Sequence, residues 1–249
     1  MKFFPTLLGA FLIFTLSGCG ILLRKRQTNH HGIEKNDFDL PVITYPSATP
    51  LSKKILFLFS GDGGWVDFED QLATEFSKRG FFIVGFNSRT YFWEKKTPQQ
   101  TADDVLLLIK KYSLQYKANR IFLCGYSFGA DVVPFIYNRL PLEIRKNVEA
   151  LQMLSPFATS DFMVHTSDLL NIAQDNNPYK VQPEVESIGI PVFCFYGTEE
   201  TPKPLRGINI KNFNLSIVPG GHKYTPESYG RIVNSFRPVR RFFQNQFFK

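Results

Sequence analysis

The chain has few cysteines and few histidines, three and four in 249 residues. So few cysteines exclude a small fold held together by disulfide bonds. The histidines are scattered, and no HxH or HxxxH pair lies in the folded part of the chain, so we expect no metal site and no cofactor held by one. The chain also lacks an internal repeat and the composition typical of collagen or of disorder.

Positive charge is in excess but is not gathered on one element. The chain has 29 Lys and Arg against 22 Asp and Glu, a net charge of +7. Nucleic-acid-binding modules concentrate such charge on one element with interleaved aromatic residues, and no helix or strand pattern here does so. The one tight cluster, Arg24 to Arg26, lies in a stretch that we assign to targeting. We therefore expect no nucleic-acid partner.

The N-terminus has the pattern of an export signal. Lys2 precedes an apolar run over residues 7–16, which is shorter than the roughly 20 residues that span a bilayer. The run ends in LSGC at residues 16–19, which resembles the lipobox of bacterial lipoproteins. That resemblance implies a signal peptide over residues 1–18 and acylation of Cys19.

A lipid anchor at Cys19 would place the protein in the cell envelope, facing the periplasm. The acyl chains and the basic cluster at 24–26 are the two signals that stable membrane anchoring needs. Gly20 slightly favours the outer membrane, by resemblance to enterobacterial lipoproteins. The polar residues 19–40 then predict a tether, and residues 41–249 predict one folded domain.

Short apolar runs alternate with helical patterns over the folded part of the chain. The expected strands are residues 55–59, 81–86, 120–125, 148–154, 190–196 and 213–218, and the expected helices are 67–79, 98–112, 130–140 and 225–248, the last broken at Pro238. Residues 157–183 have no clear period and predict a cap over a site or a surface insertion. The alternation predicts a mostly parallel sheet with helices on both faces.

Two cysteines remain after the anchor. Cys124 and Cys194 each lie inside an apolar, strand-like run. Burial as small hydrophobic side chains is the favoured interpretation. A disulfide between them is open, because export permits one and the sequence does not establish it.

Residues 125–129 read GYSFG and match the G-x-S-x-G nucleophile elbow of α/β-hydrolases. The motif follows an expected strand and precedes an expected helix, which is the context that this turn requires. Glycines at both ends let backbone segments approach closely around a strained serine. We expect Ser127 to be the nucleophile and the Phe128 N–H, at the start of the helix, to bind an oxyanion.

The base and the acid should follow the serine along the chain in this fold. His222 lies in a PGGH loop after the last expected strand, whereas the other histidines lie in the tether or in the 157–183 insertion. The acid should follow the strand that ends at Gly197. Glu200, three residues past that glycine, is favoured and Glu199 is the alternative, since either carboxylate can orient the imidazole if it reaches the ring.

A second glycine-rich loop, SGDGGW at residues 60–65, follows the first expected strand of the core. Its position matches the loop that supplies the other oxyanion donor in esterases, and the Asp62 N–H is the expected donor. We expect the amides of its three glycines to be exposed. No Gly-Lys-Ser/Thr follows, so the loop is not a phosphate-binding loop.

Five separated blocks resemble the VirJ/AcvB family of bacterial virulence proteins. They are residues 60–65, 91–93, 125–132, 134–141 and 220–222. The resemblance implies an exported α/β-hydrolase linked to type IV secretion and, through the AcvB-like members, to hydrolysis of lysyl-phosphatidylglycerol. This chain resembles the short form, without the additional N-terminal half of longer members.

The sequence thus predicts a serine ester hydrolase with an envelope lipid as substrate. Asp62 and Asp131 are candidates for binding the amines of a lysyl headgroup. Equally, Asp131 complements a helix N-terminus and Asp62 caps a turn. A non-catalytic envelope adaptor that binds secretion components through a hydrolase-like surface is the alternative function, and a generic esterase or peptidase is a third.

Overall fold

A computed structural model describes residues 34–165 and 177–236. The predicted signal peptide, Cys19 and most of the predicted tether lie outside the described residues, as do residues 166–176 and 237–249. In the described part, no helix is both long and apolar enough to cross a membrane.

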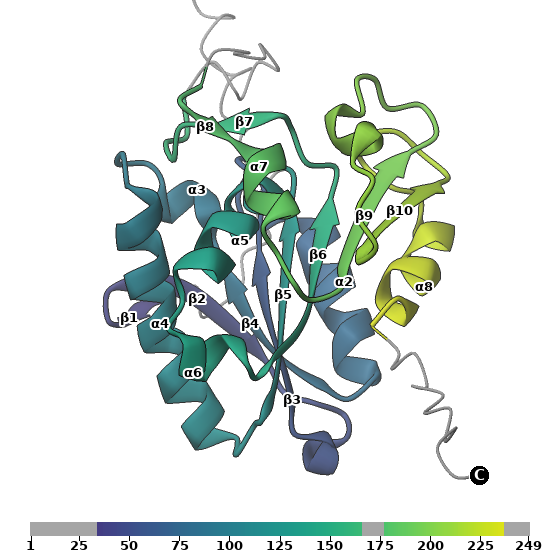
Figure 1. Cartoon of the computed structure of the whole chain (residues 1–249). Helices are drawn as coiled ribbons and strands as arrows, with labels where there is room; N and C mark the ends of the chain where they lie inside the picture. Colours follow the sequence, from purple (N-terminus) through teal and green to yellow (C-terminus); the bar gives the residue numbers. More distant parts are fainter. Residues whose placement is uncertain (1–33, 166–176, 237–249) are drawn as a thin grey trace, which may run out of the picture.

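One eight-stranded sheet forms the centre of the molecule (Figure 1). Its order is β1-β2-β4-β3-β5-β6-β9-β10. The strands are β1 (Glu34–Asp37), β2 (Leu40–Tyr45), β3 (Lys54–Phe59), β4 (Phe81–Phe86), β5 (Arg120–Tyr126), β6 (Val148–Leu154), β9 (Val192–Gly197) and β10 (Phe213–Val218). From β4 to β10 all neighbours are parallel, and β2 pairs antiparallel with both β4 and β1.

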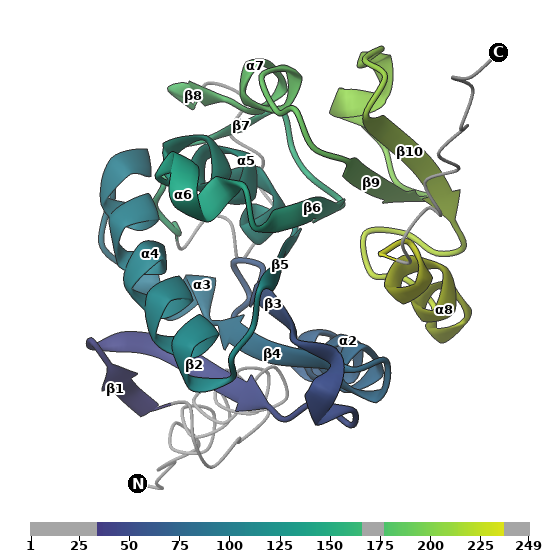
Figure 2. The same ribbon diagram turned by 60° about the horizontal axis from the view of Figure 1, so that its bottom comes forward.

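Helices cover both faces of this sheet (Figure 2). One face packs against α2 (Asp67–Lys78) and α8 (Pro226–Asn234). The other packs against α4 (Pro98–Gln115) and α5 (Phe128–Arg139). The shorter elements are α3 (Ser88–Tyr91), α6 (Leu142–Arg145), α7 (Val181–Glu186), two 3-10 turns (Pro50–Ser52 and Pro204–Gly207) and a ribbon of β7 (Thr159–Ser160) and β8 (Tyr179–Lys180). The prediction of a mostly parallel sheet between two helical layers is confirmed.

Local signals in the sequence explain where several elements begin. Thr97 Oγ1 accepts the Gln100 N–H, and Gln100 Oε1 accepts the Thr97 N–H, so the predicted capping box starts α4. Helix α2 ends before Gly80, whose φ of +83° suits a residue without Cβ. The central strands are buried on both faces, as β3 and β4 show, because helices cover both sides of the sheet.

The amino-terminal edge of the sheet was not expected. Residues 34–37 were assigned to the polar tether, but they form β1 and pair with β2. The stretch EKND carries no strand pattern of its own, so its conformation comes from this pairing. The Asp37 side chain contacts Tyr112 and Lys111 of α4, which fixes the strand to the helical layer.

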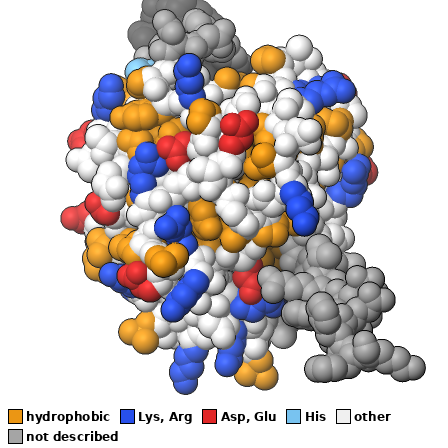
Figure 3. All heavy atoms as spheres, in the orientation of Figure 1, with side chains coloured by type: hydrophobic (Ala, Val, Ile, Leu, Met, Phe, Trp, Pro, Cys, Tyr) orange, Lys and Arg blue, Asp and Glu red, His pale blue; other side chains and the backbone are white. Residues whose placement is uncertain are grey.

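Charge on the face shown in Figure 3 is mixed: Lys and Arg side chains lie among Asp and Glu rather than forming a stripe.

Cys124 and Cys194 are buried free thiols. The sequence left open whether they form a disulfide, and the structure instead places both as small side chains in the core.

Candidate active site

Five loops that carry polar side chains meet at the carboxyl edge of the parallel strands. They follow β3, β5, β6, β9 and β10, which are consecutive strands in the sheet. Ligand sites in open α/β sheets form at this edge. The predicted site residues lie on four of these loops, at residues 62, 127–128, 199–200 and 222.

Ser127 occupies a strained turn between β5 and α5. Its φ of 51° and ψ of −121° lie in a region that side chains rarely adopt. The turn is held closed, because the Ser127 N–H donates to the Leu154 carbonyl at 2.8 Å. A Cβ on Gly125 would lie 2.1 Å from the Gly129 oxygen, and one on Gly129 would lie 2.4 Å from the Phe59 oxygen, so only glycine fits at either position.

A continuous chain of hydrogen bonds joins Ser127 to an acid. The distance between Ser127 Oγ and His222 Nε2 is 2.9 Å, and the distance between His222 Nδ1 and Glu200 Oε1 is also 2.9 Å. His165, the other histidine in the described part, instead pairs with Asp161. The structure thus brings together the three residues that the sequence proposed as nucleophile, base and acid.

The backbone brings His222 within reach of Ser127 through glycines at 197 and 220. A Cβ on Gly197 would lie 2.3 Å from the carbonyl oxygens of residues 220 and 221, so the loop that carries His222 packs directly on the end of β9. Gly220 has a φ of +110°, which turns the chain back toward the sheet.

Three donors hold the Glu200 carboxylate. Besides His222, the Gly197 N–H donates to Oε2 at 2.9 Å and the Ser155 hydroxyl donates to it at 2.8 Å. Burial alone would raise the pKa of Glu200, but these hydrogen bonds outweigh it and lower the pKa below its usual value. Glu199 is exposed and has no recorded contact with the imidazole, so the geometry favours Glu200 over the alternative.

Ser155 is a member of the site that the sequence did not indicate. Ser155 follows the last residue of β6 and has a φ of 52°. Its hydroxyl lies 2.6 Å from the Tyr224 hydroxyl, which in turn donates to the Phe195 carbonyl. The acid is therefore anchored to a buried network that reaches back into the core. Nothing in the sequence distinguishes this serine from the others.

Two aromatic rings flank His222. The ring centroids of Tyr126 and Phe157 each lie 5.4 Å from that of the imidazole, and the Tyr126 hydroxyl donates to the His222 carbonyl. Phe157 begins the insertion that was predicted to be a cap or a surface segment, so at least its first residue lies at the site. These contacts limit the orientations that the imidazole can adopt.

Of the two roles that the sequence left open for Asp131, the structure favours a structural one. Asp131 is 2% exposed, and its carboxylate accepts the Phe157 N–H at 2.6 Å. Burial raises the pKa of Asp131 well above its usual range, and the Phe157 N–H only partly opposes the effect. A carboxyl group so deeply buried does not reach an amine in solvent. Its role is to hold the backbone at Phe157, beside His222.

The second glycine-rich loop contacts the serine turn directly. A Cβ on Gly61 would lie 3.3 Å from Ser127 Cβ. The expectation that the amides of all three glycines are exposed is wrong for two of them, because the Gly61 N–H donates to Glu69 and the Gly64 N–H donates to the Gly61 carbonyl. Asp62 occupies the turn between these bonds and is half-buried.

Glu69 of α2 is the second residue that the sequence analysis missed. It is 1% exposed, and its two oxygens accept the Gly61 and Val66 N–H groups, each at 3.2 Å. Burial, with a smaller contribution from nearby Asp62, raises the pKa of Glu69 to about 7, although hydrogen bonds from backbone N–H groups lower it. A glutamate at the third position of a helix after a turn is a capping signal that would have drawn attention to it.

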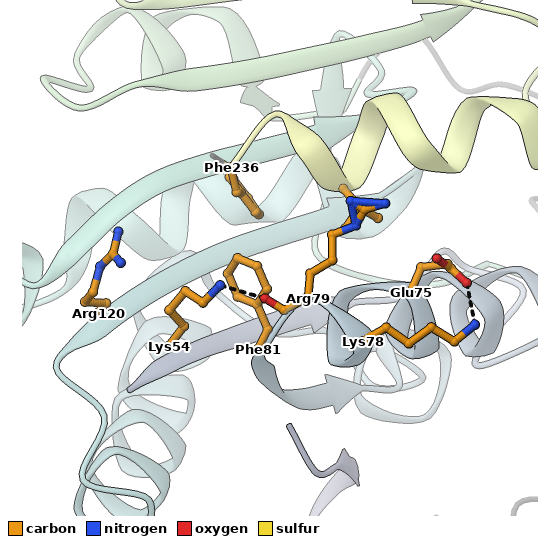
Figure 4. A pocket seen from close by; sticks show the side chains of 8 residues that line it. Lys54, Glu75, Lys78, Arg79, Phe81, Arg120 and Phe236 are labelled. Atoms are coloured by element: carbon orange, nitrogen blue, oxygen red, sulfur yellow. Dashed lines mark hydrogen bonds and ion pairs between the residues drawn. The ribbon is translucent and has the colours of Figure 1, made fainter. Parts of the chain in front are cut away.

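A separate cavity of about 630 Å³ lies at the amino ends of the parallel strands, opposite the Ser127 group (Figure 4). Its wall includes Lys54, Phe81 and Arg120 at the starts of three adjacent strands, together with Arg79 and Phe236. No member of the Ser127 group lines it, so we do not assign the chemistry to this cavity.

Several solved structures share this fold. Est1E from Butyrivibrio proteoclasticus matches with a TM-score of 0.55 at 16% identity, over 80% of this chain and 92% of that one. A lipase-esterase related protein from Clostridium acetobutylicum matches with 0.56 at 16%, over 78% and 97%, and a proline iminopeptidase from Mycobacterium smegmatis with 0.56 at 14%, over 78% and 93%. Such identities establish the fold, and the prediction of an α/β-hydrolase fold is confirmed.

The sequence itself matches one described family. No curated protein matches the chain. The family described as "Bacterial virulence protein (VirJ)" matches residues 53–236, which include every strand from β4 to β10 and the four loops that carry the predicted site residues. The chain therefore belongs to the VirJ family of bacterial virulence proteins.

Proposed function

We propose that this protein is a serine ester hydrolase with Ser127 as nucleophile, His222 as base and Glu200 as acid. The observation that carries the proposal is the unbroken hydrogen-bonded chain Ser127–His222–Glu200, with both heavy-atom distances 2.9 Å, at a strained serine turn. Nucleophilic catalysis by serine requires such a base within hydrogen-bond reach and a third group that orients it.

In the proposed reaction each of these residues has a defined step. Ser127 Oγ attacks the ester carbonyl carbon while His222 Nε2 accepts its proton, and the Phe128 and Asp62 N–H groups bind the oxygen that becomes negative. His222 then donates the proton to the departing alcohol, which leaves an acyl group on Ser127. Water, deprotonated by His222, attacks the acyl carbon and releases the acid. Glu200 keeps the proton on Nδ1 and stabilises the imidazolium.

The charge around Ser127 favours a substrate with a cationic acyl group. Asp62, Glu69 and Glu200 are all close enough to raise the pKa of Tyr126, the residue before the nucleophile, although burial raises it most. A concentration of carboxyl groups attracts ammonium groups. Aminoacyl-phosphatidylglycerol, with the lysyl ester as leading candidate, meets this condition, and Asp62 is the carboxylate we assign to its amines.

We further propose that the protein acts in the cell envelope in connection with type IV secretion. The lipobox-like LSGC at residues 16–19 supports a lipid anchor that faces the periplasm, and family membership supports the link to virulence. An anchored enzyme would meet lipid substrates at the membrane surface, where their local concentration is high.

A fluorophosphonate probe, which forms a covalent bond with activated serines, tests the proposal. We expect the wild-type protein to be labelled and the Ser127→Ala variant to be unlabelled and inactive on p-nitrophenyl acetate, with turnover lower by roughly 10⁴ to 10⁶. The variant should keep its melting temperature. A wild-type protein that neither labels nor hydrolyses the ester would instead support the adaptor function.

A further inference from the structure

The loop at residues 61–66 is fixed at both ends by a single side chain. Glu69 Oε1 accepts the Gly61 N–H and Oε2 accepts the Val66 N–H. Between these points the Gly64 N–H donates to the Gly61 carbonyl at 3.1 Å, which closes a turn with Asp62 as its second residue. A carboxylate is well suited to this task, because both oxygens accept and neither donates.

We propose that Glu69 is a positioning residue for catalysis: its buried carboxylate holds the 61–66 loop against Ser127, and with it the Asp62 amide that binds the oxyanion. The inference rests on the proposed function, since it assigns Glu69 to the esterase site. Gly61 is the point of contact, as its Cα faces Ser127 Cβ closely enough that an added Cβ would lie 3.3 Å away.

Burial of this carboxylate is costly, which argues against a purely structural role. Glu69 is 1% exposed and has no recorded salt bridge within the described ranges, and a neutral side chain would fill the same space without the cost of desolvation. A neutral glutamine, however, presents an N–H₂ donor to one of the two backbone N–H groups. Only the ionised glutamate satisfies both ends of the loop at once.

The charge state of Glu69 should therefore control the order of the loop. Burial raises the pKa of Glu69 to about 7, so the carboxylate gains a proton, and loses one of its two acceptor positions, within the neutral range. The groups that face it are Asp62 from the loop, Tyr45 from β2, Tyr126 from β5 and Tyr229 from α8. The pKa of each tyrosine is raised, so these phenols stay neutral in this range.

Stability and turnover should then depend on pH in opposite directions. The pKa of Glu69 is higher in the folded protein than in the unfolded chain, so its contribution to stability is lost as pH rises through about 7. Turnover, in contrast, needs the ionised form and should increase over the same interval. A residue that only supports the fold would make both quantities change together.

The test compares Glu69→Gln with Glu75→Gln, a matched change on the same helix at a residue that pairs with Lys78. We expect Glu69→Gln to lower kcat for p-nitrophenyl acetate by about ten- to a hundredfold at pH 8 with little change in KM, because an oxyanion donor acts in the transition state. Affinity for an alkylboronic acid, which forms a tetrahedral anion on serine, should fall by the same factor. Glu75→Gln should behave as wild type.

The ratio of wild-type to variant kcat cancels every effect of pH that the two proteins share. This ratio should rise through pH 7, while the melting temperature of the wild type falls relative to that of Glu69→Gln. A constant ratio, or a variant within twofold of wild type at pH 8, would overturn the inference. If wild type is inactive and unlabelled by fluorophosphonate, the proposed function has failed instead, and the inference fails with it.

A measurement on the wild-type protein covers the case in which Glu69→Gln does not fold. Hydrogen exchange should show protection of the Gly61 and Val66 amides that decreases below pH 7. The Ser127 amide, which donates to the Leu154 carbonyl, is the internal control and should stay protected. Unchanged protection of all three amides would contradict a loop held by an ionised Glu69.

Discussion

Replacement of Glu200 by glutamine should separate its role as acid from its role in the fold. The carboxylate accepts three hydrogen bonds, from His222, Gly197 and Ser155, whereas a glutamine side chain has one acceptor oxygen and one donor nitrogen. If the oxygen stays on the Gly197 N–H, the new N–H₂ faces His222 Nδ1 and favours the imidazole tautomer that cannot accept the Ser127 proton.

The expected loss of activity depends on which orientation the glutamine side chain adopts. The wrong tautomer at a serine triad lowers kcat by about 10⁴, which is ~5.4 kcal/mol of transition-state stabilisation. The opposite rotamer restores the tautomer but leaves the Gly197 N–H without an acceptor, which costs about 1–3 kcal/mol of stability. We therefore expect kcat/KM for a p-nitrophenyl ester to fall by about 10³ to 10⁴, measured at pH 8 with a melting curve for the same sample.

Glu199→Gln is the matched control, because it changes the adjacent, exposed residue in the same way. It should retain kcat/KM within about threefold, since its side chain is in solvent and surface substitutions have small effects. The pKa of Glu200 is lowered in the folded protein, so its contribution to stability is present above the unfolded value and is lost as pH falls through the folded one. The melting temperatures of wild type and Glu200→Gln should accordingly converge in acid. A larger loss of turnover in Glu199→Gln than in Glu200→Gln would refute the assignment.

Three other predictions concern the substrate, the serine turn and the anchor. Asp62→Asn should raise KM about ten- to a hundredfold for an aminoacyl lipid and spare p-nitrophenyl acetate, because a charge-assisted hydrogen bond contributes roughly 1.5–3 kcal/mol. Asp131→Asn should affect both substrates alike. Equal effects of Asp62→Asn on the two substrates would contradict headgroup recognition. Gly129→Ala places a Cβ 2.4 Å from a backbone oxygen and should cost about 1–3 kcal/mol, seen as a lower melting temperature, while Gly189→Ala, with no atom within 4 Å, should not. Cys19→Ser should abolish incorporation of labelled palmitate and leave an unprocessed precursor, and unchanged labelling would mean that the cysteine is not the acylated residue.

The serine turn was predictable because its residues form one short motif. A Cβ on Gly125 would meet the backbone of Gly129, and a Cβ on Gly129 would meet the end of β3, so the five-residue pattern reflects the geometry of the turn. His222 and Glu200 were predictable in a different way, from the order of the site residues along an α/β-hydrolase chain. The exclusion of Glu199 needed the structure, because the loop after β9 decides which of two adjacent carboxylates points inward.

The roles of the remaining site residues depend on packing between distant elements. Glu69 stands at the capping position of α2, a signal that the sequence analysis missed, but its bond to the Gly61 N–H follows only from the packing of α2 against the sheet. The choice between the two roles left open for Asp131 needed the structure for the same reason, because α5 directs its side chain into the protein. Strand β1 is polar and forms by pairing with β2, so the sequence of residues 34–37 alone does not predict a strand.

Two glutamates at this site show how environment assigns different roles to one residue type. Glu200 receives three hydrogen bonds, one of them from an imidazole, and its pKa is lowered despite burial, so it stays ionised throughout the range in which His222 must work. Glu69 receives two bonds from backbone amides alone, is more deeply buried and lies near Asp62, and its pKa is raised to about 7. The acid that orients the base is therefore always charged near neutrality, whereas the carboxylate that holds the oxyanion loop changes charge there. It follows that the response of this protein to pH near 7 should depend on the state of Glu69.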